Sequence, residues 1–315
     1  MKVAVLDDYQ RVAQAMADWS SLQGCTIDFF HEPLGSAEHI VSTLAPYQVI
    51  VAMRERTRFP AAVIDALPQL RLFVTTGMNN RAVDKPALAA RGIPLCGTPW
   101  AEDTTVELAW GLILSLAHAI PIQQASLRGG RWQSTIGTSL RGKTLGVLGL
   151  GTIGTKMARL AKTFQMRVIA YSPNLTTERA AVVEVEAVDK HTFFSQSDVL
   201  SVHLILSDTT RGIVGAAELA LMKPSALLIN TSRGPLVDEH ALAAALHRGA
   251  LSGAACDVYS EEPIPPKHPL LAAPNTVLTP HIGYVTKEVY TAWFPAVIED
   301  IQGFLAGSLV RQIPL

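Results

Sequence analysis

Short apolar runs alternate with amphipathic stretches along the first hundred residues of the chain. The runs have the length of strands buried on both faces, and the stretches between them carry apolar residues at helical spacing. Strands that alternate with helices predict a parallel sheet. The predicted strands are 3–6, 26–30, 49–51, 72–74 and 94–96, and the predicted helices between them lie near 37–44, 61–67 and 85–91.

The same alternation begins again at Leu145, after a helical stretch over residues 102–119 and a Gly/Arg-rich connection over 128–132. We expect 102–119 to be a rigid connector beside a ligand site, a buried core helix, or both. The amphipathic stretch 287–305 comes too late to extend the second sheet, so we expect it to pack on the first domain. The later strands of the second sheet are predicted at 167–171, 199–202, 226–230, 253–255 and 277–278.

Length and composition agree with two domains. A chain of 315 residues exceeds what one hydrophobic core usually organises, and 49% hydrophobic with 17% charged residues is typical of a packed globular protein. We predict an α/β protein with two Rossmann-like or flavodoxin-like parallel-sheet domains and a cleft between them. Residues 1–97 with 283–315 form the discontinuous domain, and residues 98–282 form the other.

The charge balance favours small-molecule chemistry. The formal net charge is −1 and no basic run is present, so nothing indicates a nucleic-acid partner or an anionic membrane surface. The N-terminal segment is a strand ending in Asp7 and Asp8, which is not the pattern of a signal peptide and which we read as a strand end without a metal role. No apolar run reaches the length of a membrane span.

Cysteine usage indicates a reducing compartment. The three cysteines, Cys25, Cys96 and Cys256, are odd in number, widely separated and without a C-x-x-C pair. That pattern argues against a disulfide framework or a zinc site. We therefore expect a cytoplasmic protein with no metal.

A glycine-rich turn joins the first strand of the second half to the next helix. The apolar run from Thr144 continues into Gly149-Leu150-Gly151-Thr152-Ile153-Gly154, followed by a helical stretch. Gly149 allows a tight reversal, Gly151 lets a pyrophosphate approach the backbone, and Gly154 lets the helix pack closely on the strand. The helix N-terminus offers free N–H groups to an anion, so the turn predicts a dinucleotide site.

The residue expected to hold the adenosine ribose departs from the usual pattern. An acidic residue commonly lies about 20 positions beyond the first glycine, but here Ser172 follows the strand, 23 positions after Gly149. Ser172, Pro173 and Asn174 can still hydrogen-bond a ribose, and the missing charge removes the repulsion that excludes a 2′-phosphate. The choice between NAD and NADP stays open, with NAD slightly favoured because no Arg or Lys directly follows the strand; Arg179 is either a phosphate ligand or a solvated charge.

Three further segments place ionisable side chains just after predicted strands, where ligands bind in open α/β sheets. They are Asn230–Pro235, Cys256–Pro263 and Leu278–Gly283. The imidazole of His281 is suited to donate and accept a proton near neutral pH. Glu262 can fix the tautomer of that imidazole, and the fork-shaped guanidinium of Arg233 can clamp a substrate carboxylate.

Together, G-L-G-T-I-G, N-T-S-R-G, D-V-Y-S-E-E-P and T-P-H-I-G, in this order, resemble the D-isomer-specific 2-hydroxyacid dehydrogenase family over nearly the whole length. The resemblance implies that Arg233, Glu262 and His281 are catalytic and that Asp257 holds the nicotinamide carboxamide. It also implies a homodimer, for which residues 108–131 offer apolar surface. The residues that it places near the cofactor are Thr152, Ile153, His203, Thr231 and Gly283, and those that it places facing the substrate are Arg54, Gly77, Met78 and Asn79, with Arg233.

Three positions leave room for other interpretations. Asn79 stands where many members carry a second glycine, and Asn tolerates a left-handed backbone, so the turn can survive with a different pocket. His203 is expected either to line the cofactor site or to pack beside it. We interpret His118 as a satisfied core or interface histidine.

These observations predict an NAD(P)-dependent oxidoreductase that interconverts a small 2-oxo acid and its D-2-hydroxy acid. The alternative is a non-enzymatic, NAD(H)-sensing regulator of the corepressor type, which would carry similar residues. The absence of long disordered tails favours the enzyme. The sequence does not name the physiological substrate.

Overall fold

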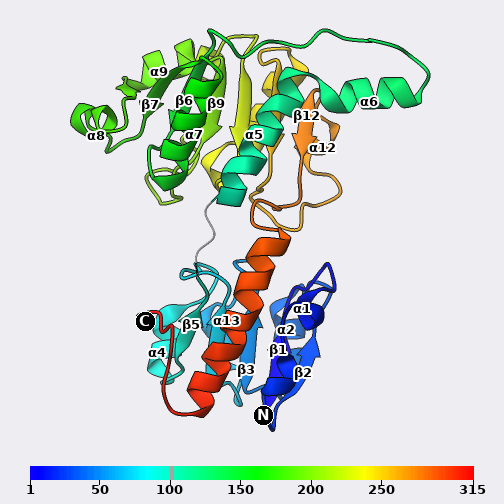
Figure 1. Cartoon of the computed structure of the whole chain (residues 1–315), viewed down its shortest axis with the longest axis vertical. Coiled ribbons are helices and arrows are strands. Elements are labelled where there is room, and N and C mark those ends of the chain that lie inside the picture. The colour runs from blue at the N-terminus through cyan, green and yellow to red at the C-terminus, as the bar shows by residue number, and fades with distance from the viewer. Residues whose placement is uncertain (100–102) are drawn as a thin grey trace. The chain divides into compact units, whose positions relative to one another are not determined.

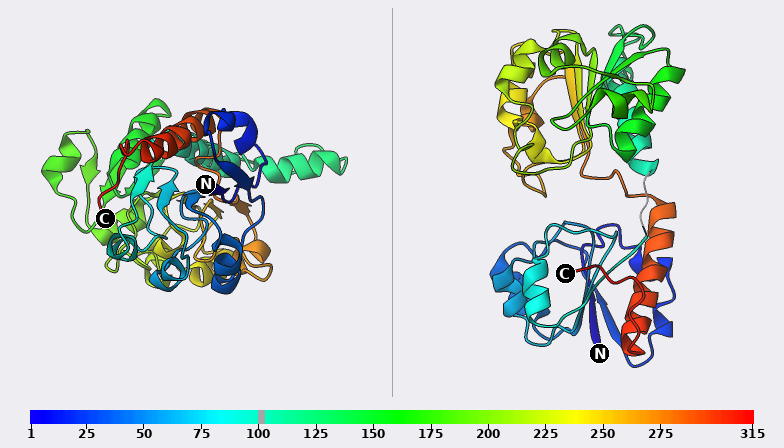
Figure 2. Two further views of the ribbon diagram at one scale, coloured as in Figure 1. Left: turned by 90° about the horizontal axis from the view of Figure 1, so that it is seen from below. Right: turned by 90° about the vertical axis from the view of Figure 1, so that its left-hand side faces the viewer.

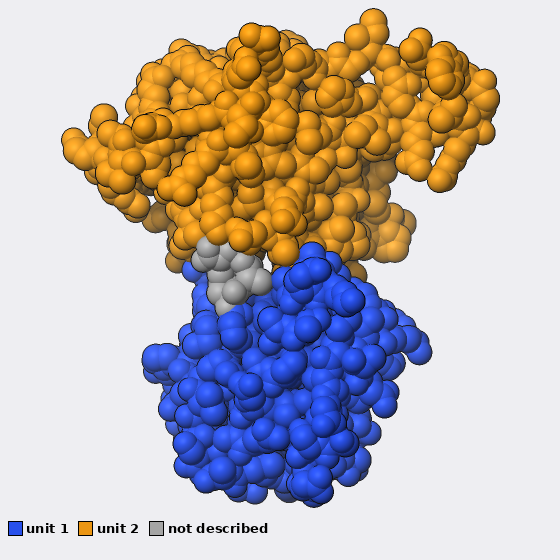
Figure 3. Space-filling model, in the orientation of Figure 1, with its two compact units in different colours: residues 1–101, 285–315 blue, residues 102–284 orange. Residues whose placement is uncertain are grey.

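The structure is a computed structural model that describes residues 1–99 and 103–315. It divides into two compact units, residues 1–101 with 285–315 and residues 102–284 (Figure 3). These divisions fall four residues after the predicted boundary at 97 and two residues after the one at 282. The first helix of the second unit is described from Asp103, so its predicted start at Glu102 lies outside the described residues.

The first unit contains a five-stranded parallel sheet with the strand order β2-β1-β3-β4-β5 (Figure 1). This order is that of flavodoxin-like sheets. Each strand is three or four residues long, and β3 and β4 are buried throughout, as the continuous apolar runs require. The strands are β1 (Lys2–Val5), β2 (Thr26–Phe29), β3 (Val49–Ala52), β4 (Leu72–Thr75) and β5 (Leu95–Gly97).

Helices cover both faces of this sheet (Figure 2). The C-terminal helix α13 packs on β4, on β5 and on α1, and it lies in the first unit. The opposite face buries Phe59 against Phe73, edge to face with ring centroids 4.9 Å apart. The helices are α1 (Ala13–Met16), α2 (Ala37–Leu44), α3 (Ala61–Asp65), α4 (Lys85–Ala90) and α13 (Lys287–Leu305), with a 3-10 turn η1 (Trp19–Ser21).

The second unit contains a seven-stranded parallel sheet with the order β12-β11-β10-β9-β6-β7-β8. The strand order reverses between β6 and β9, as in the Rossmann fold, and ligands bind at the carboxyl ends of strands near such a reversal. The predicted pair of parallel-sheet α/β folds is therefore confirmed. The strands are β6 (Thr144–Leu148), β7 (Arg167–Tyr171), β8 (Glu186–Ala187), β9 (Val199–Val202), β10 (Leu227–Asn230), β11 (Gly253–Cys256) and β12 (Thr276–Leu278).

Two hydrophobic layers enclose the second sheet. One layer lies under α5 and α7, and the other lies under α9 to α12. Most of these helices are short, and the sequence patterns predicted few of them. The helices are α5 (Asp103–Ala117), α6 (Ile120–Arg128), α7 (Thr152–Thr163), α8 (Thr177–Ala181), α9 (Lys190–Gln196), α10 (Ala216–Leu221), α11 (Glu239–His247) and α12 (Pro269–Ala272), with a 3-10 turn η2 (Gly234–Leu236).

The prediction of a single helix over residues 102–119 is wrong at the C-terminal end. Helix α5 stops at Ala117, and Ala119 adopts a left-handed backbone with φ of +51°, which breaks the helix. A separate helix, α6, begins at Ile120, and Pro121 lies in its first turn. Proline fits there because it has no backbone N–H, and an N–H in the first turn of a helix would have no partner within the helix. His118, at this break, is exposed, so it is not a core histidine, and the interface alternative stays a prediction.

Within the described residues, no single helix is long and apolar enough to cross a membrane. Helices α5 and α6 meet the same test of length and composition only as a pair, and they are bent by 59° at the break between them.

Candidate functional site

The glycine turn lies between β6 and α7, as predicted. Gly149 has φ of +98°, a backbone that side chains rarely adopt. A Cβ on Gly154 would lie 2.1 Å from the Gly149 carbonyl oxygen, so the close approach of helix and strand requires glycine there. A Cβ on Gly151 would meet nothing within 4 Å. The chain therefore needs Gly149 and Gly154 for its own packing, whereas the space beside Gly151 is open.

The next strand, β7, ends at Tyr171, so Ser172, Pro173 and Asn174 form the turn that follows it. The described turn carries no carboxylate at the position where a ribose-binding acid is expected. The Arg179 guanidinium donates a hydrogen bond to the Asn174 carbonyl oxygen at 3.2 Å. This contact keeps a positive charge at the turn.

Other candidate cofactor residues also lie just beyond strand ends of the same sheet. His203 follows β9, Thr231 follows β10, Asp257 follows β11, and Gly283 lies beyond β12. Burial lowers the pKa of His203 to about 4 although part of its surface is exposed, so the ring is neutral at pH 7. Its Nε2 lies 2.8 Å from the Ser201 hydroxyl.

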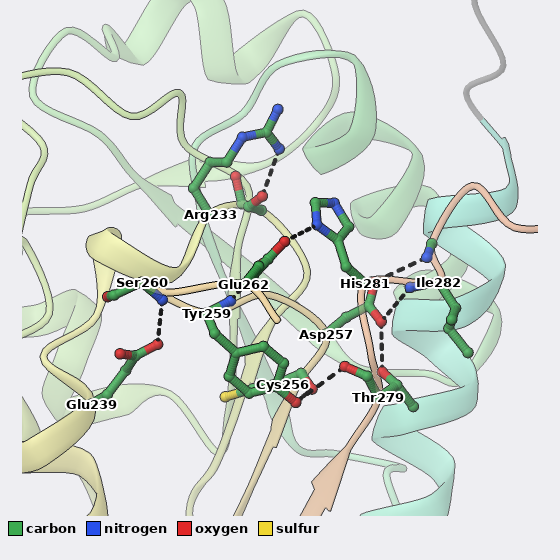
Figure 4. A network of polar contacts seen from close by, with 12 residues as sticks. Arg233, Glu239, Cys256, Asp257, Tyr259, Ser260, Glu262, Thr279, His281 and Ile282 are labelled. Carbon is green, nitrogen blue, oxygen red and sulfur yellow. Dashed lines mark hydrogen bonds and ion pairs between the residues drawn. The ribbon is translucent and has the colours of Figure 1, made fainter. Parts of the chain in front are cut away.

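Asp257 ties the end of β11 to the segment that carries His281. Its Oδ1 accepts hydrogen bonds from the Thr279 hydroxyl at 2.6 Å and the Ile282 N–H at 2.8 Å, and its Oδ2 accepts one from the Gly283 N–H at 2.9 Å (Figure 4). Burial raises the pKa of Asp257, and these hydrogen bonds and the nearby His281 oppose that effect. The carboxylate thus holds the Thr279 side chain before His281 and the backbone directly after it.

His281 and Glu262 form a hydrogen-bonded pair. The distance from His281 Nδ1 to Glu262 Oε2 is 2.6 Å, with side chains 22% and 29% exposed. Burial tends to raise the pKa of Glu262, but the hydrogen bond and charge of His281, the Tyr259 N–H and the charge of Arg233 outweigh it and lower the pKa. The carboxylate is therefore ionised, and it leaves His281 Nε2 as the ring nitrogen that can exchange a proton with a ligand.

Arg233 follows β10, and its charge is close enough to Glu262 to help lower the pKa of that carboxyl (Figure 4). Its Nη1 donates a hydrogen bond to the Ser232 carbonyl oxygen at 2.7 Å. Gly234, the next residue, passes so close to the loop after β11 that a Cβ would lie 2.0 Å from the carbonyl carbon of Tyr259. This close approach sets the Arg233 segment against the loop that carries Glu262.

Apart from Arg233, the predicted substrate residues lie in the first unit, after β3 and β4. Arg54 and Gly77 have φ of +52° and +82°, and a Cβ on Gly77 would collide with the Arg54 guanidinium. The Arg54 N–H donates to the Thr76 hydroxyl at 2.9 Å, and its guanidinium carbon lies 5.9 Å from the Trp293 ring centroid. Met78 and Asn79 are exposed. The left-handed backbone allowed for Asn79 is not found there; Arg54 and Gly77 adopt it instead.

The residues after β6 and β10 fit a bound dinucleotide. Helix α7 is 12 residues long, and its N-cap Gly151 provides no side-chain cap for the free N–H groups of the first turn. The open space at Gly151 lies at this positive end, which suits a pyrophosphate. The buried Thr231 hydroxyl has no hydrogen-bond partner among the described residues, so it remains available to a ligand.

Several residues that support the site were not singled out from the sequence. Thr279 binds Asp257, Tyr259 binds Glu262, and Glu239 and His268 form a second buried histidine–carboxylate pair at 3.2 Å. Tyr259 and Thr279 lie inside segments already noted for their chemistry, but nothing in the sequence marks Glu239 and His268 as partners, because 29 residues separate them.

Comparisons with known proteins agree with this geometry. Residues 110–283 match the family model described as "D-isomer specific 2-hydroxyacid dehydrogenase, NAD binding domain". A structure of phosphoglycerate oxidoreductase from Vibrio cholerae superposes with a TM-score of 0.92 at 35% identity, covering 98% of this chain and 100% of that one.

Curated relatives point to the same family. The chain is 36% identical to D-3-phosphoglycerate dehydrogenase of Archaeoglobus fulgidus over 88% of its length, but it spans only about half (53%) of that protein. It is 35% identical to glyoxylate reductase of Aeropyrum pernix over 80% of its own length and 78% of the relative's. The chain therefore belongs to the D-isomer-specific 2-hydroxyacid dehydrogenases, a family of NAD-binding oxidoreductases.

Proposed function

We propose that this protein catalyses reversible hydride transfer between a nicotinamide cofactor and a small acid, interconverting a 2-oxo acid and its D-2-hydroxy acid. The observation that carries the proposal is the 2.6 Å contact between His281 Nδ1 and Glu262 Oε2, with Arg233 beside it. An imidazole held by a carboxylate and a neighbouring guanidinium is the set of groups that this reaction needs.

In the direction of reduction, a bound nicotinamide supplies the hydride that reaches the carbonyl carbon. His281 donates a proton from Nε2 to the carbonyl oxygen, so the carbonyl becomes an alcohol and the imidazole becomes neutral. Glu262 accepts the Nδ1–H hydrogen bond throughout, which orients the ring and leaves Nε2 to exchange the proton. In oxidation, the same nitrogen accepts the alcohol proton.

Arg233 is assigned to the substrate. Its guanidinium binds the carboxylate in a bidentate contact and polarises the adjacent carbonyl, which favours the charge that develops on oxygen. Residues of the first unit, Arg54, Gly77, Met78 and Asn79, are assigned to the remainder of the substrate and to the choice among 2-oxo acids. The names of the relatives support a small 2-oxo or 2-hydroxy acid.

The unit of residues 102–284 is assigned to the dinucleotide and the other unit to the substrate. Open space at Gly151, the free start of α7 and the unpartnered Thr231 hydroxyl support the first assignment. NAD is the cofactor named for the family, and Ser172 with Arg179 supports tolerance of NADP as well. The proposed cofactor ligands are Gly149, Gly151, Thr152, Ile153, Gly154, Ser172, Pro173, Asn174, His203, Thr231, Asp257 and Gly283.

We also propose a homodimer formed through the second unit. Large apolar side chains are exposed on α6 and in the segment after it, which is unfavourable for a surface that stays in water. They are Ile120 (49% exposed), Ile122 (45%), Leu127 (58%), Trp132 (78%) and Ile136 (96%). Light scattering of the purified chain should give twice the monomer mass, and Trp132→Ser with Ile136→Ser should lower it.

A cytoplasmic setting is part of the same proposal. Cys25, Cys96 and Cys256 are all free thiols, which suits a reducing compartment.

A turnover panel tests the activity. Glyoxylate, hydroxypyruvate, pyruvate, phenylpyruvate and 2-ketoisovalerate are each offered with NADH and with NADPH, and nucleotide oxidation is followed by absorbance. Reduction of at least one acid is expected. Tight NADH binding without any reduction would favour the regulator of the corepressor type, an alternative that the names of the relatives do not support.

A further inference from the structure

We propose that Glu239, Tyr259 and His268 form a buried brace that positions Glu262 for its hydrogen bond with His281. The proposal rests on the proposed function, because it assigns these residues a role through the catalytic pair. None of the three reaches the substrate in the proposed mechanism, so they are positioning residues.

The main chain of Tyr259 holds Glu262 directly. Its N–H donates to Glu262 Oε1 at 2.8 Å, while Glu262 Oε2 accepts from His281. One carboxylate oxygen is thus held by the loop and the other by the catalytic imidazole. The direction in which Glu262 presents Oε2 therefore depends on where the Tyr259 backbone lies.

The side chain of Tyr259 joins the two loops that carry the catalytic pair. Its hydroxyl lies 3.0 Å from both the Cys256 and the Thr279 carbonyl oxygens, so its single hydrogen is shared between them (Figure 4). The Thr279 carbonyl also accepts the His281 N–H at 3.1 Å. Burial raises the pKa of Tyr259, so the hydroxyl stays protonated as a donor.

Glu239 and His268 fix the other side of the same loop. Glu239 Oε1 accepts the Ser260 N–H at 2.9 Å, and its Oε2 lies 3.2 Å from His268 Nε2. His268 Nδ1 accepts the Leu270 N–H at 3.4 Å, so the ring proton belongs on Nε2. The His268 ring meets the Tyr259 ring edge to face, with centroids 5.7 Å apart.

The brace is a buried unit rather than a solvated loop. The side chains of His268 and Glu239 are 7% and 10% exposed, and Tyr259 is 6% exposed. Glu239 must accept two N–H donors, which a carboxylate can do with its two oxygens. A glutamine has one acceptor oxygen, so Glu239→Gln leaves one of the two donors without a partner while changing little in volume.

The first test is Tyr259→Phe, which keeps the ring and removes the hydroxyl. We expect kcat for reduction of the best oxo acid with NADH to fall about tenfold, because small displacements of a positioned group have large effects on rate. The directly measured Kd of NADH should not change. The matched control is Tyr47→Phe in the first unit, whose hydroxyl donates to Asp28 Oδ2 at 2.8 Å. It should lower the melting temperature comparably and leave kcat unchanged.

A double-mutant cycle separates positioning from plain stability. If the brace acts through Glu262, adding Tyr259→Phe to Glu262→Gln should not reduce kcat further. Glu239→Gln should behave like Tyr259→Phe and serves in its place if that variant does not fold. An equal loss of kcat in both backgrounds, or a lower melting temperature with unchanged kcat, would overturn the proposal.

Amide hydrogen exchange gives a readout that does not depend on turnover. Exchange in residues 257–263 and 279–283 should become faster in Tyr259→Phe than in the wild type or in Tyr47→Phe. Unchanged exchange there would contradict the brace. If the wild type reduces no oxo acid, the proposed function fails, whereas this measurement still decides whether the brace holds the Glu262 loop.

Discussion

His281 and Glu262, 19 residues apart in the chain, lie with Nδ1 and Oε2 only 2.6 Å apart. Glu262 follows β11 and His281 follows β12, and these neighbouring parallel strands end at the same edge of the sheet. The strand register thus places a proton donor beside a carboxylate.

Replacing the imidazole tests its proposed role. His281→Ala should reduce kcat by roughly 10²- to 10⁴-fold, the range usual for loss of a general acid. NADH affinity, measured by fluorescence titration, should stay near the wild-type value, because His281 acts on the substrate. A variant with undiminished kcat would remove His281 from the mechanism.

The depressed pKa of Glu262 has a consequence for stability. Since the folded-state pKa lies below the unfolded one, the ionised group contributes stability above the unfolded pKa, and this is lost as pH falls through the folded pKa. In denaturant melts, the wild type should therefore have a higher free energy of unfolding than Glu262→Gln near neutral pH. This difference should shrink below a pH of about 4 to 5. If that difference in the free energy of unfolding did not change with pH in this range, the lowered pKa of Glu262 would be contradicted.

Asp300 in α13 should make stability depend on pH in the opposite direction from Glu262. Burial raises its pKa to about 6, although Arg311 Nε lies 3.3 Å from its Oδ1. A raised carboxyl pKa means that the folded state binds more protons, so stability falls as pH rises from about 4 to 6 and is constant above. Between these two pH values, the free energy of unfolding of the wild type, measured in urea, should fall by on the order of 1–3 kcal/mol relative to that of Asp300→Asn. If the free energies of unfolding of the two proteins changed with pH in parallel, the raised pKa of Asp300 would be refuted.

Two glycines of the turn after β6 should separate stability from binding. Gly154→Ala forces a Cβ to within 2.1 Å of the Gly149 carbonyl oxygen, so it should destabilise the fold by about 1–3 kcal/mol. Gly151→Ala meets nothing within 4 Å and has an ordinary φ of −88°, so it should melt like the wild type. If a pyrophosphate lies beside Gly151, this variant should nevertheless bind NADH at least about tenfold more weakly. Unchanged NADH affinity would place the phosphates elsewhere.

Ser172 tests the choice of cofactor. Ser172→Asp restores a charge that repels a 2′-phosphate and accepts hydrogen bonds from ribose hydroxyls. The ratio of the NADPH to the NADH Kd should rise about tenfold or more, whereas the uncharged control Ser172→Asn should leave it close to the wild-type value. A ratio that Ser172→Asp does not move would mean that this turn does not meet the ribose.

The sequence alone determined the strands other than the two-residue β8, the glycine turn and the order of the site segments. Such features depend on neighbours in the chain: a buried parallel strand must be continuously apolar, as in β9 and β10, and Gly149 must be glycine because φ is +98°. The family motifs likewise supplied Arg233, Glu262 and His281 as candidates, and the structure brings these three side chains together.

Only the tertiary structure decided contacts between residues far apart and conformations set by packing. The break at Ala119 and the left-handed backbone at Arg54 rather than Asn79 have no clear local signal, since both positions carry residues that usually avoid φ above zero. Glu239 and His268 become partners because α11 and α12 pack side by side. Sequence patterns record which residues favour a strand or a turn, but only the folded chain determines which side chains then meet, because that depends on packing across the whole sheet.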